Sequence, residues 1–302
     1  QAIKTTIYAH AEFNAYSQQT QQTFSEWQNK QTLFLKALSV GCKPKAIIFQ
    51  LSEDLLSAFD NKPLIDKYDV YQSLMSYWLD TMKDDIYLIS EDGWKAQPER
   101  IVIKNKAGKN IDKGWDCDLV PKTLVIDRYY LAEKQAIEGL EAEKEVISSQ
   151  ILELEEEHSG EDGYLVNKAN VLKRLKAIDT AKLKAANAEE IKVLKAYLKL
   201  IDQQAAISKQ IREMSFELDN KALAHYQTLT EADIKQLVVD DKWMTTIANA
   251  VQAEMDRLSQ RLTGRIKQLA ERYETPLPKM TEEVANLSAK VAAHLKNMGV
   301  SL

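Results

Sequence analysis

The sequence has few residues that break helices or form crosslinks. Its 302 residues include nine glycines, six prolines and two cysteines. Scarce glycine and proline, beside abundant leucine, alanine, glutamate and lysine, favour a mainly helical protein of two or three domains. Cys42 and Cys117 lie far apart in the sequence, with no histidine at metal-binding spacing. They predict buried or unreactive thiols in a reducing compartment rather than a disulfide or a zinc site.

The chain also lacks any long apolar run. No stretch approaches the ~20 apolar residues of a membrane-spanning helix, and no signal peptide opens the sequence. We therefore expect a cytoplasmic protein with no membrane partner. The net charge of −5 argues against general coating of nucleic acid but leaves room for a local basic face. Because the sequence opens on Gln1 and not on methionine, we expect it to be a piece of a longer polypeptide.

Residues 1–121 predict a mixed helical domain with a small β element. Apolar side chains at helical spacing in residues 24–40 indicate one helix, which Gly41 ends. A capping-type residue, Ser52, is expected to start the next helix. Residues 69–79 then place several aromatic and aliphatic side chains on one helical face, which is more typical of a packed core than of a binding site.

The pattern in residues 85–115 changes from helical to strand-like. Residues 86–89 and 101–104 are short runs rich in β-branched and aromatic side chains, and residues 105–108 are typical of a turn. We expect a small sheet or hairpin within this stretch, rimmed by its two tryptophans.

Residues 122–225 predict a long antiparallel coiled-coil arm. Pro121 suits the first turn of a helix that runs to about Glu157, and the polar residues 158–163 end that helix. A returning helix follows from about residue 182 to residue 223. Apolar side chains recur at three- and four-residue spacing on both limbs, and we expect them to form the seam of the arm or to bind a partner. These seam residues are Ile137, Leu140, Ile147, Ile151, Leu154, Leu194, Leu198 and Ile201.

Charge differs sharply between the two limbs. Residues 138–162 have ten acidic side chains and one lysine, whereas residues 166–199 have nine basic and three acidic side chains. We expect this complementarity to fix the pairing and direction of the limbs more than their stability, since an exposed ion pair contributes about 0–1 kcal/mol.

Residues 226–302 predict a C-terminal helical region. Either Thr228 or Thr230 is expected to cap a helix, and the proline-rich residues 275–278 to interrupt the long helix that follows. Thr281 is expected to cap the last helix. The apolar stripe of that helix includes Val284, Leu287, Val291 and Leu295.

Five cations gather on the long helix of this region. A solvated face, or pairing with the acids of a partner, is the ordinary explanation of such a cluster, and contact with DNA phosphates is the functional one. The cations are Arg257, Arg261, Arg265, Lys267 and Arg272.

Several segments, spread from about Ile7 to Gly299, are similar in sequence and order to a known family. They are Leu55–Leu56, Asp69–Gln72, Asp84–Ile89, Asp92–Trp94, Glu155–Gly163, Leu237–Trp243, Leu262–Tyr273 and Thr275–Pro278. With these segments the chain resembles the C-terminal half of the modification (methyltransferase) subunit of type I restriction-modification systems, in its longer form. The Asp-Asp-Lys-Trp and Leu-Thr-Gly-Arg sequences within them are less generic than coiled-coil heptads, which arise by convergence.

The resemblance implies a parent subunit that methylates adenine N6 in DNA with S-adenosylmethionine. It also implies that the C-terminal helices pack against helical spacers of a specificity subunit. Two modification subunits and one specificity subunit would enclose double-stranded DNA, with a restriction subunit as a further partner. The chain itself has no two adjacent prolines and no Gly-x-Gly, so neither the catalytic Asn-Pro-Pro-aromatic loop nor the cofactor turn can be assigned to it. We expect no catalytic, cofactor-binding or metal-binding residue here.

Two other interpretations stay open. Asp240 and Asp241 could bind a divalent cation, although a helix cap or a turn is the more ordinary role of such a pair. The four histidines are isolated in the sequence and predict no zinc site.

The chain could also be a stand-alone coiled-coil scaffold or dimerisation module with no nucleic-acid role.

Overall fold

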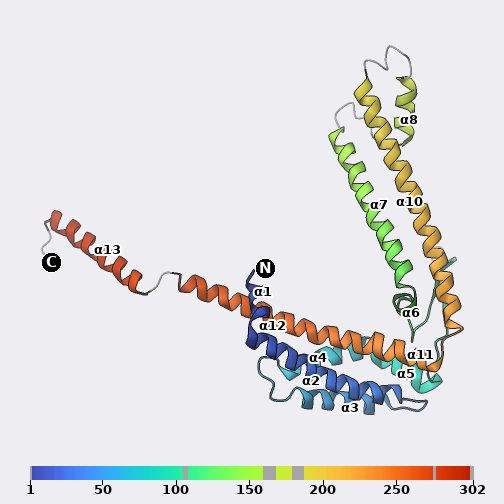
Figure 1. The fold of residues 1–302 in the computed structure, drawn as a ribbon, viewed down its shortest axis with the longest axis horizontal. Helices are drawn as coiled ribbons and strands as arrows, with labels where there is room; N and C mark the ends of the chain where they lie inside the picture. Colours follow the sequence, from blue (N-terminus) through green and yellow to red (C-terminus); the bar gives the residue numbers. More distant parts are fainter. Residues whose placement is uncertain (1, 105–107, 159–167, 179–186, 275–276, 300–302) are drawn as a thin grey trace. The chain divides into compact units, whose positions relative to one another are not determined.

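The protein is mainly helical, with one small two-stranded antiparallel sheet, and this confirms the predicted fold class (Figure 1). The computed structural model describes residues 2–104, 108–158, 168–178, 187–274 and 277–299. Among these residues, no helix combines the length and the apolar character that crossing a bilayer requires.

Contacts group the chain into two units, one formed by residues 1–91 with 243–302 and the other by residues 92–242. These boundaries differ from the predicted divisions after residues 121 and 225. The difference has a simple cause. Helix α12 (Thr245–Arg272) packs on helices near the N-terminus, whereas the β-hairpin packs against the base of the arm.

The first unit is a bundle of helices. Its elements are α1 (Ala2–Ala9), α2 (Ala11–Lys36), α3 (Pro44–Ala58), α4 (Lys67–Tyr77), the π-helical segment η1 (Trp78–Met82), α5 (Lys83–Asp92), α12, and α13 (Leu277–Asn297). Helix α12 lies against α1 and α4, and α3 lies against α2 and α4. Leu51, Leu74 and Ile86 are fully buried between these helices. The aromatic face predicted for residues 69–79 is in part core, since Val70, Leu74 and Trp78 are buried.

The predicted strand at residues 86–89 is wrong, because these residues lie in α5. Ile86 and Ile89 are three positions apart and both are fully buried. On a helix this spacing places them on one face, where they contribute to the core. Burial of that face outweighs the β propensity of the side chains, which is a weak preference.

The second unit consists of the hairpin, the arm and a short connecting region. Its elements are β1 (Glu99–Lys104), β2 (Asn110–Asp116), α6 (Lys122–Tyr129), α7 (Leu131–Glu157), α8 (Lys168–Ala177), α10 (Ala188–Tyr226), α11 (Glu231–Lys235) and most of the π-helical segment η2 (Gln236–Met244), whose last two residues belong to the first unit. Strands β1 and β2 pair with Ile103 opposite Ile111. This confirms a hairpin that contains the predicted strand at residues 101–104. Helices α7 and α10 lie side by side and run in opposite directions, as predicted for the arm (Figure 1).

The first limb of the arm is two helices and not one. Tyr130, with φ −131° and ψ 31°, leaves the helical conformation between α6 and α7. Its hydroxyl lies 3.3 Å from Nδ1 of His225 on α10, and the ring of Tyr129 lies tilted against the same imidazole at 4.2 Å between ring centroids. These contacts with α10 accompany a break that the sequence pattern does not reveal.

One predicted cap is confirmed and two are wrong. Thr230 forms a capping box with Asp233 at the start of α11. Ser52 and Thr281, in contrast, lie inside α3 and α13. Their hydroxyls donate to the carbonyls of Phe49 and Leu277, at 3.0 and 2.9 Å. Inside a helix, a serine or threonine hydroxyl can bond in this way to a carbonyl of the preceding turn instead of capping the helix.

Candidate interaction surfaces

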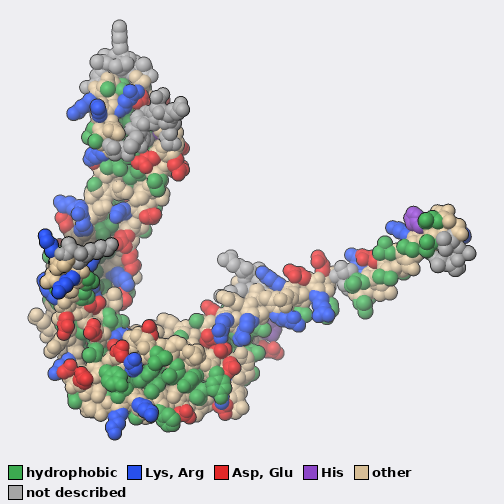
Figure 2. Space-filling model, turned by 180° about the vertical axis from the view of Figure 1, so that it is seen from behind, with side chains coloured by type: hydrophobic (Ala, Val, Ile, Leu, Met, Phe, Trp, Pro, Cys, Tyr) green, Lys and Arg blue, Asp and Glu red, His purple; other side chains and the backbone are tan. Residues whose placement is uncertain are grey.

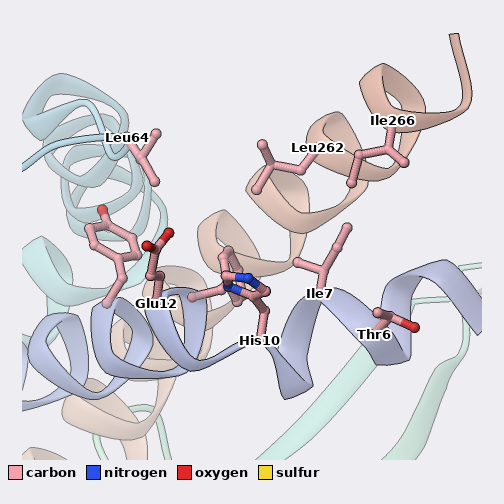
Figure 3. Close-up of a pocket in the computed structure, with 9 residues that line it drawn as sticks. Thr6, Ile7, His10, Glu12, Leu64, Leu262 and Ile266 are labelled. Carbon is pink, nitrogen blue, oxygen red and sulfur yellow. The ribbon is translucent and has the colours of Figure 1, made fainter. Parts of the chain in front are cut away.

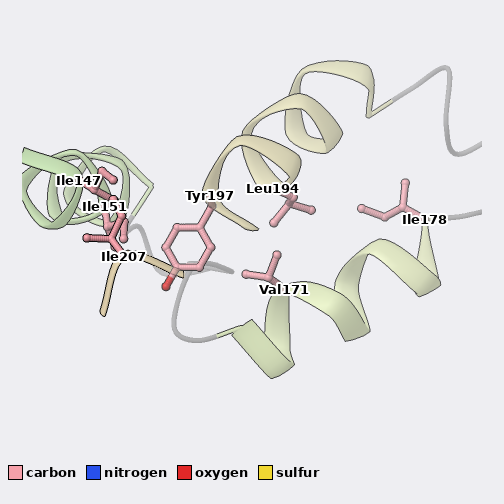
Figure 4. Packing of buried hydrophobic residues seen from close by; sticks show 7 residues of the cluster. All are labelled: Ile147, Ile151, Val171, Ile178, Leu194, Tyr197 and Ile207. Atoms are coloured by element: carbon pink, nitrogen blue, oxygen red, sulfur yellow. The ribbon is translucent and has the colours of Figure 1, made fainter. Parts of the chain in front are cut away.

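The predicted seam of the arm is a buried contact between the arm's own helices. Ile147 and Ile151 of α7 and Leu194 of α10 belong to one apolar cluster (Figure 4). The cluster is completed by Val171, Ile178, Tyr197 and Ile207, with Leu140, Leu154, Leu198 and Ile201 packed against it. Ile137 is also buried, nearer the base of the arm. The seam therefore faces the returning limb, and a partner of the arm would use another surface.

Sequence periodicity did not identify Tyr197 as part of this contact. Its ring is buried in the cluster, and its hydroxyl donates a 2.7 Å hydrogen bond to Oε1 of Glu155 on α7. Burial, the hydrogen bond to Glu155 and the charge of Glu155 raise the pKa of Tyr197 to about 12. The bond links the two limbs at a defined register, which an apolar contact alone does not fix.

A few individual ion pairs connect the helices of the arm, whereas the charge pattern predicted complementarity along both limbs. Glu133 of α7 pairs with Lys221 of α10 at 3.5 Å. Arg174 of α8 makes two hydrogen bonds, 2.6 and 3.2 Å long, to the carboxylate of Glu190 on α10. The bidentate pair orients α8 on α10. Residues 159–163, which were predicted to end the first limb, lie outside the described residues.

The base of the arm is fixed through Asp219. Its two carboxylate oxygens accept hydrogen bonds from Trp115 Nε1 at 2.7 Å and from Lys122 Nζ at 2.9 Å. The Trp115 ring also meets Tyr226 edge to face, at 5.3 Å. Cys117 is buried nearby as a free thiol, and burial raises its pKa. The arm is thus joined to the hairpin by charge-assisted bonds and aromatic packing.

The Asp240–Asp241 pair has a structural explanation. Both residues lie in the π-helical segment η2, and Asp241 Oδ2 accepts a 2.7 Å hydrogen bond from Arg128. In the described part of the chain, no group of three or more histidine, cysteine, aspartate or glutamate residues could hold a metal ion. The cation hypothesis therefore has no support from the geometry.

The five predicted cations of α12 do not have equal surroundings. Arg257 is paired with Asp69 at 2.8 Å and with Glu254 at 2.5 Å, so it holds α12 to α4. Arg265 donates to Gln268, and Arg272 lies over the ring of Tyr273. Arg261, Arg265, Lys267 and Arg272 are all exposed.

The last helix presents an apolar stripe that is not buried. No residue of α13 is buried. Its large apolar side chains recur at spacings of three and four. Leu295 is half-buried, and the others are between 50% and 79% exposed; they are Leu277, Met280, Val284, Leu287, Val291 and Met298 just beyond the helix. Figure 2 shows these green side chains along the C-terminal helix. Sequence periodicity predicted the stripe but not its exposure.

A second apolar surface lies where α1, α2, the α3–α4 loop and α12 meet. It is a groove of about 570 Å³ (Figure 3). Ile7, Leu64 and Ile266 contribute to it from three different elements. No sequence pattern brings these three residues together, because they lie in segments far apart in the chain.

Comparison of the chain with protein-family models, with curated proteins and with solved structures gave no match in any of the three.

Proposed function

We propose that this chain is the assembly part of a type I restriction-modification DNA adenine-N6 methyltransferase subunit, and that α13 binds a helical segment of the specificity subunit. The observation that supports the binding is the exposed apolar stripe of α13. The choice of partner rests on the resemblance in sequence described above. In this proposal S-adenosylmethionine and the catalytic residues belong to the rest of the parent protein.

The exposure of α13 makes a partner helix the natural occupant. A single helix of about 20 residues is marginally stable in water without tertiary contacts. Burying one large aliphatic side chain contributes about 1.5–3 kcal/mol. The α13 residues at positions 277, 280, 284, 287 and 291 follow the a and d positions of a heptad, which suits packing against another amphipathic helix.

The arm has a different role in this proposal. Its seam is filled by its own side chains, so it acts as a rigid spacer and not as the docking surface. The exposed cations of α12 could contact DNA phosphates, or acids of a partner, in the assembled complex with the specificity and restriction subunits.

The proposal is tested by coexpressing the chain with the specificity subunit and measuring the mass of the purified complex by light scattering. Val284→Asp with Leu287→Asp is expected to abolish the complex, because both charges fall within the apolar stripe. Ala285→Asp is the matched control, since Ala285 is exposed on the same helix but outside the stripe. A complex that survives the double substitution would contradict the proposed docking surface.

A second candidate, dimerisation with no nucleic-acid role, is favoured by one observation. With the heptad above, Glu283 and Lys290 occupy g positions, and an antiparallel pair of α13 helices would place each opposite the other. Glu283→Lys should then weaken a homodimer, and Glu283→Lys with Lys290→Glu should restore it. A stable homodimer that ignores the specificity subunit would favour this candidate over the first.

A further inference from the structure

We propose that the groove beside Leu64 binds a bulky apolar side chain from an amphipathic partner helix flanked by acidic residues. This inference concerns a surface other than the stripe of α13 and does not depend on the function proposed above.

The groove is walled by apolar side chains from separate elements. Its lining consists of Thr6, Ile7, His10, Glu12, Phe13, Tyr16, Leu64, Leu262 and Ile266. Figure 3 shows Leu64 on one side of the opening, Leu262 and Ile266 on the other, and His10 and Ile7 below it. Pockets of this kind, apolar with a few polar groups at the edge, receive the anchor side chains of protein partners.

Leu64 is held in an unusual backbone conformation at the edge of the groove. Its φ is +68°, which is rare for a large L side chain. A 2.9 Å hydrogen bond from the Ile65 amide to the Pro63 carbonyl closes a three-residue turn around it. Such a turn with positive φ at its centre is uncommon and strained. The neighbouring Ile65 is buried, whereas Leu64 is 56% exposed.

One hydroxyl of the groove lining fixes this turn. The Tyr16 hydroxyl donates to the carbonyl of Pro63 and accepts a 3.2 Å hydrogen bond from the Ile65 amide. The residues on both sides of Leu64 are therefore tied to α2. Strain of this kind persists where the surrounding structure over-determines it, and it concentrates at sites that hold a ligand. The fold thus maintains an apolar side chain at the groove that core packing does not require.

The surface beyond the groove indicates a helical, acidic occupant. From Leu262 and Ile266 the apolar line of α12 continues through Leu269 and Tyr273, at helical spacing. Exposed cations border this line on both flanks: Arg261, Arg265 and Arg272 each precede a member of the line, and Lys267 follows one. A helix laid along α12 would place its apolar anchor in the groove and its acids against these cations.

Two other occupants fit less well. DNA phosphates would meet the cations but would leave the apolar groove and the apolar line of α12 without a role. A small apolar molecule would fill the groove but would leave the continuation along α12 and its cations without a role. The acidic amphipathic helix accounts for all three features.

The test uses the full chain and a stapled, fluorescein-labelled helix with leucine, phenylalanine and leucine at i, i+4 and i+7, flanked by glutamates. Fluorescence anisotropy should show binding by the unaltered chain. Leu64→Gly and Ile266→Asp should each weaken it at least tenfold. Glycine adopts positive φ without strain, so Leu64→Gly keeps the fold. Leu33→Asp, on an exposed part of α2 outside the groove, should leave the affinity unchanged.

Charge and specificity are tested with the same probe. A helix with lysine in place of each glutamate should bind at least tenfold more weakly at low salt. Val284→Asp in α13 should change neither the affinity for the glutamate helix nor that for the lysine helix. The proposal would be overturned if the Leu64→Gly and Ile266→Asp variants bound the glutamate helix as tightly as the unaltered chain does. Equal binding of both helices would also overturn it, as would binding of anilinonaphthalene sulfonate at the groove with no binding of either helix. Failure of the specificity subunit to bind would contradict only the function proposed for α13.

Discussion

The indole Nε1 of Trp243 donates a 2.7 Å hydrogen bond to Oδ2 of Asp85, and both side chains are buried in the first unit. The two residues belong to separate segments of those that carry the family resemblance. A buried carboxylate needs hydrogen-bond donors, because its desolvation is otherwise uncompensated. This contact gives a physical reason for the tryptophan in the Asp-Asp-Lys-Trp sequence.

Trp243→Phe should therefore destabilise the first unit. The substitution removes the N–H donor to Asp85 but keeps an aromatic ring at this position. We therefore expect the free energy of unfolding to fall by about 1–3 kcal/mol. Thermal unfolding followed by circular dichroism measures the effect. Tyr87→Phe, at an exposed position of the same helix as Asp85, is the control and should change the melting temperature little. Equal melting of the Trp243→Phe variant and the unaltered chain would show that the bond contributes no stability.

The seam of the arm gives a second prediction. Ile147→Glu places a charge in the buried cluster and should cost several kcal/mol, about 3 or more. Ile147→Leu keeps volume and polarity and should cost less than about 1.5 kcal/mol. The neighbouring Val146 is 59% exposed, so Val146→Glu serves as the matched charge control. Urea unfolding of the three variants decides the matter, and similar midpoints for Ile147→Glu and Val146→Glu would mean that the seam is not closed in solution.

Tyr197 gives a prediction in alkali. Its pKa is raised to about 12 in the folded protein, against about 10 in an unfolded chain. The unfolded state therefore loses its tyrosine proton first, and the stabilisation that is complete below pH 10 declines as the pH rises toward 12. Tyr197→Phe should reduce the fall in unfolding free energy between pH 9.5 and 11.5, measured in urea. An unchanged slope would contradict the raised pKa.

The sequence predicts this fold best where long periodic patterns decide it. The arm, the hairpin near Ile101–Lys104 and the helix with the α13 stripe all follow from repeats that extend over several turns or a complete strand. Residues 86–89 were misassigned because a four-residue apolar run has no period long enough to distinguish strand from helix. The break at Tyr130 is accompanied by contacts with His225, which lies on another helix, and local patterns contain no information on such contacts.

The candidate surfaces were predicted less completely than the fold. The seam residues were identified, since burial on α7 and α10 follows the heptad, but Tyr197 was not, because its role depends on Glu155 across the arm. The groove could not be predicted. It requires the positive φ of Leu64 and the approach of Tyr16 to residues 63–65, and neither is encoded in a short motif.

The cations of α12 give the last prediction, which separates binding from stability. Arg257 is paired with Asp69 and Glu254, so Arg257→Glu should destabilise the first unit, by up to about 1 kcal/mol for a pair this exposed. Arg261→Glu with Arg265→Glu should leave the melting temperature unchanged, because both side chains are exposed. The same double variant should weaken binding to duplex DNA or to the specificity subunit. Titrations at several salt concentrations distinguish the two partners, since each lost phosphate contact lowers the salt dependence of DNA binding by about one unit in slope. Unchanged binding to both partners would remove Arg261 and Arg265 from the interfaces with DNA and with the specificity subunit.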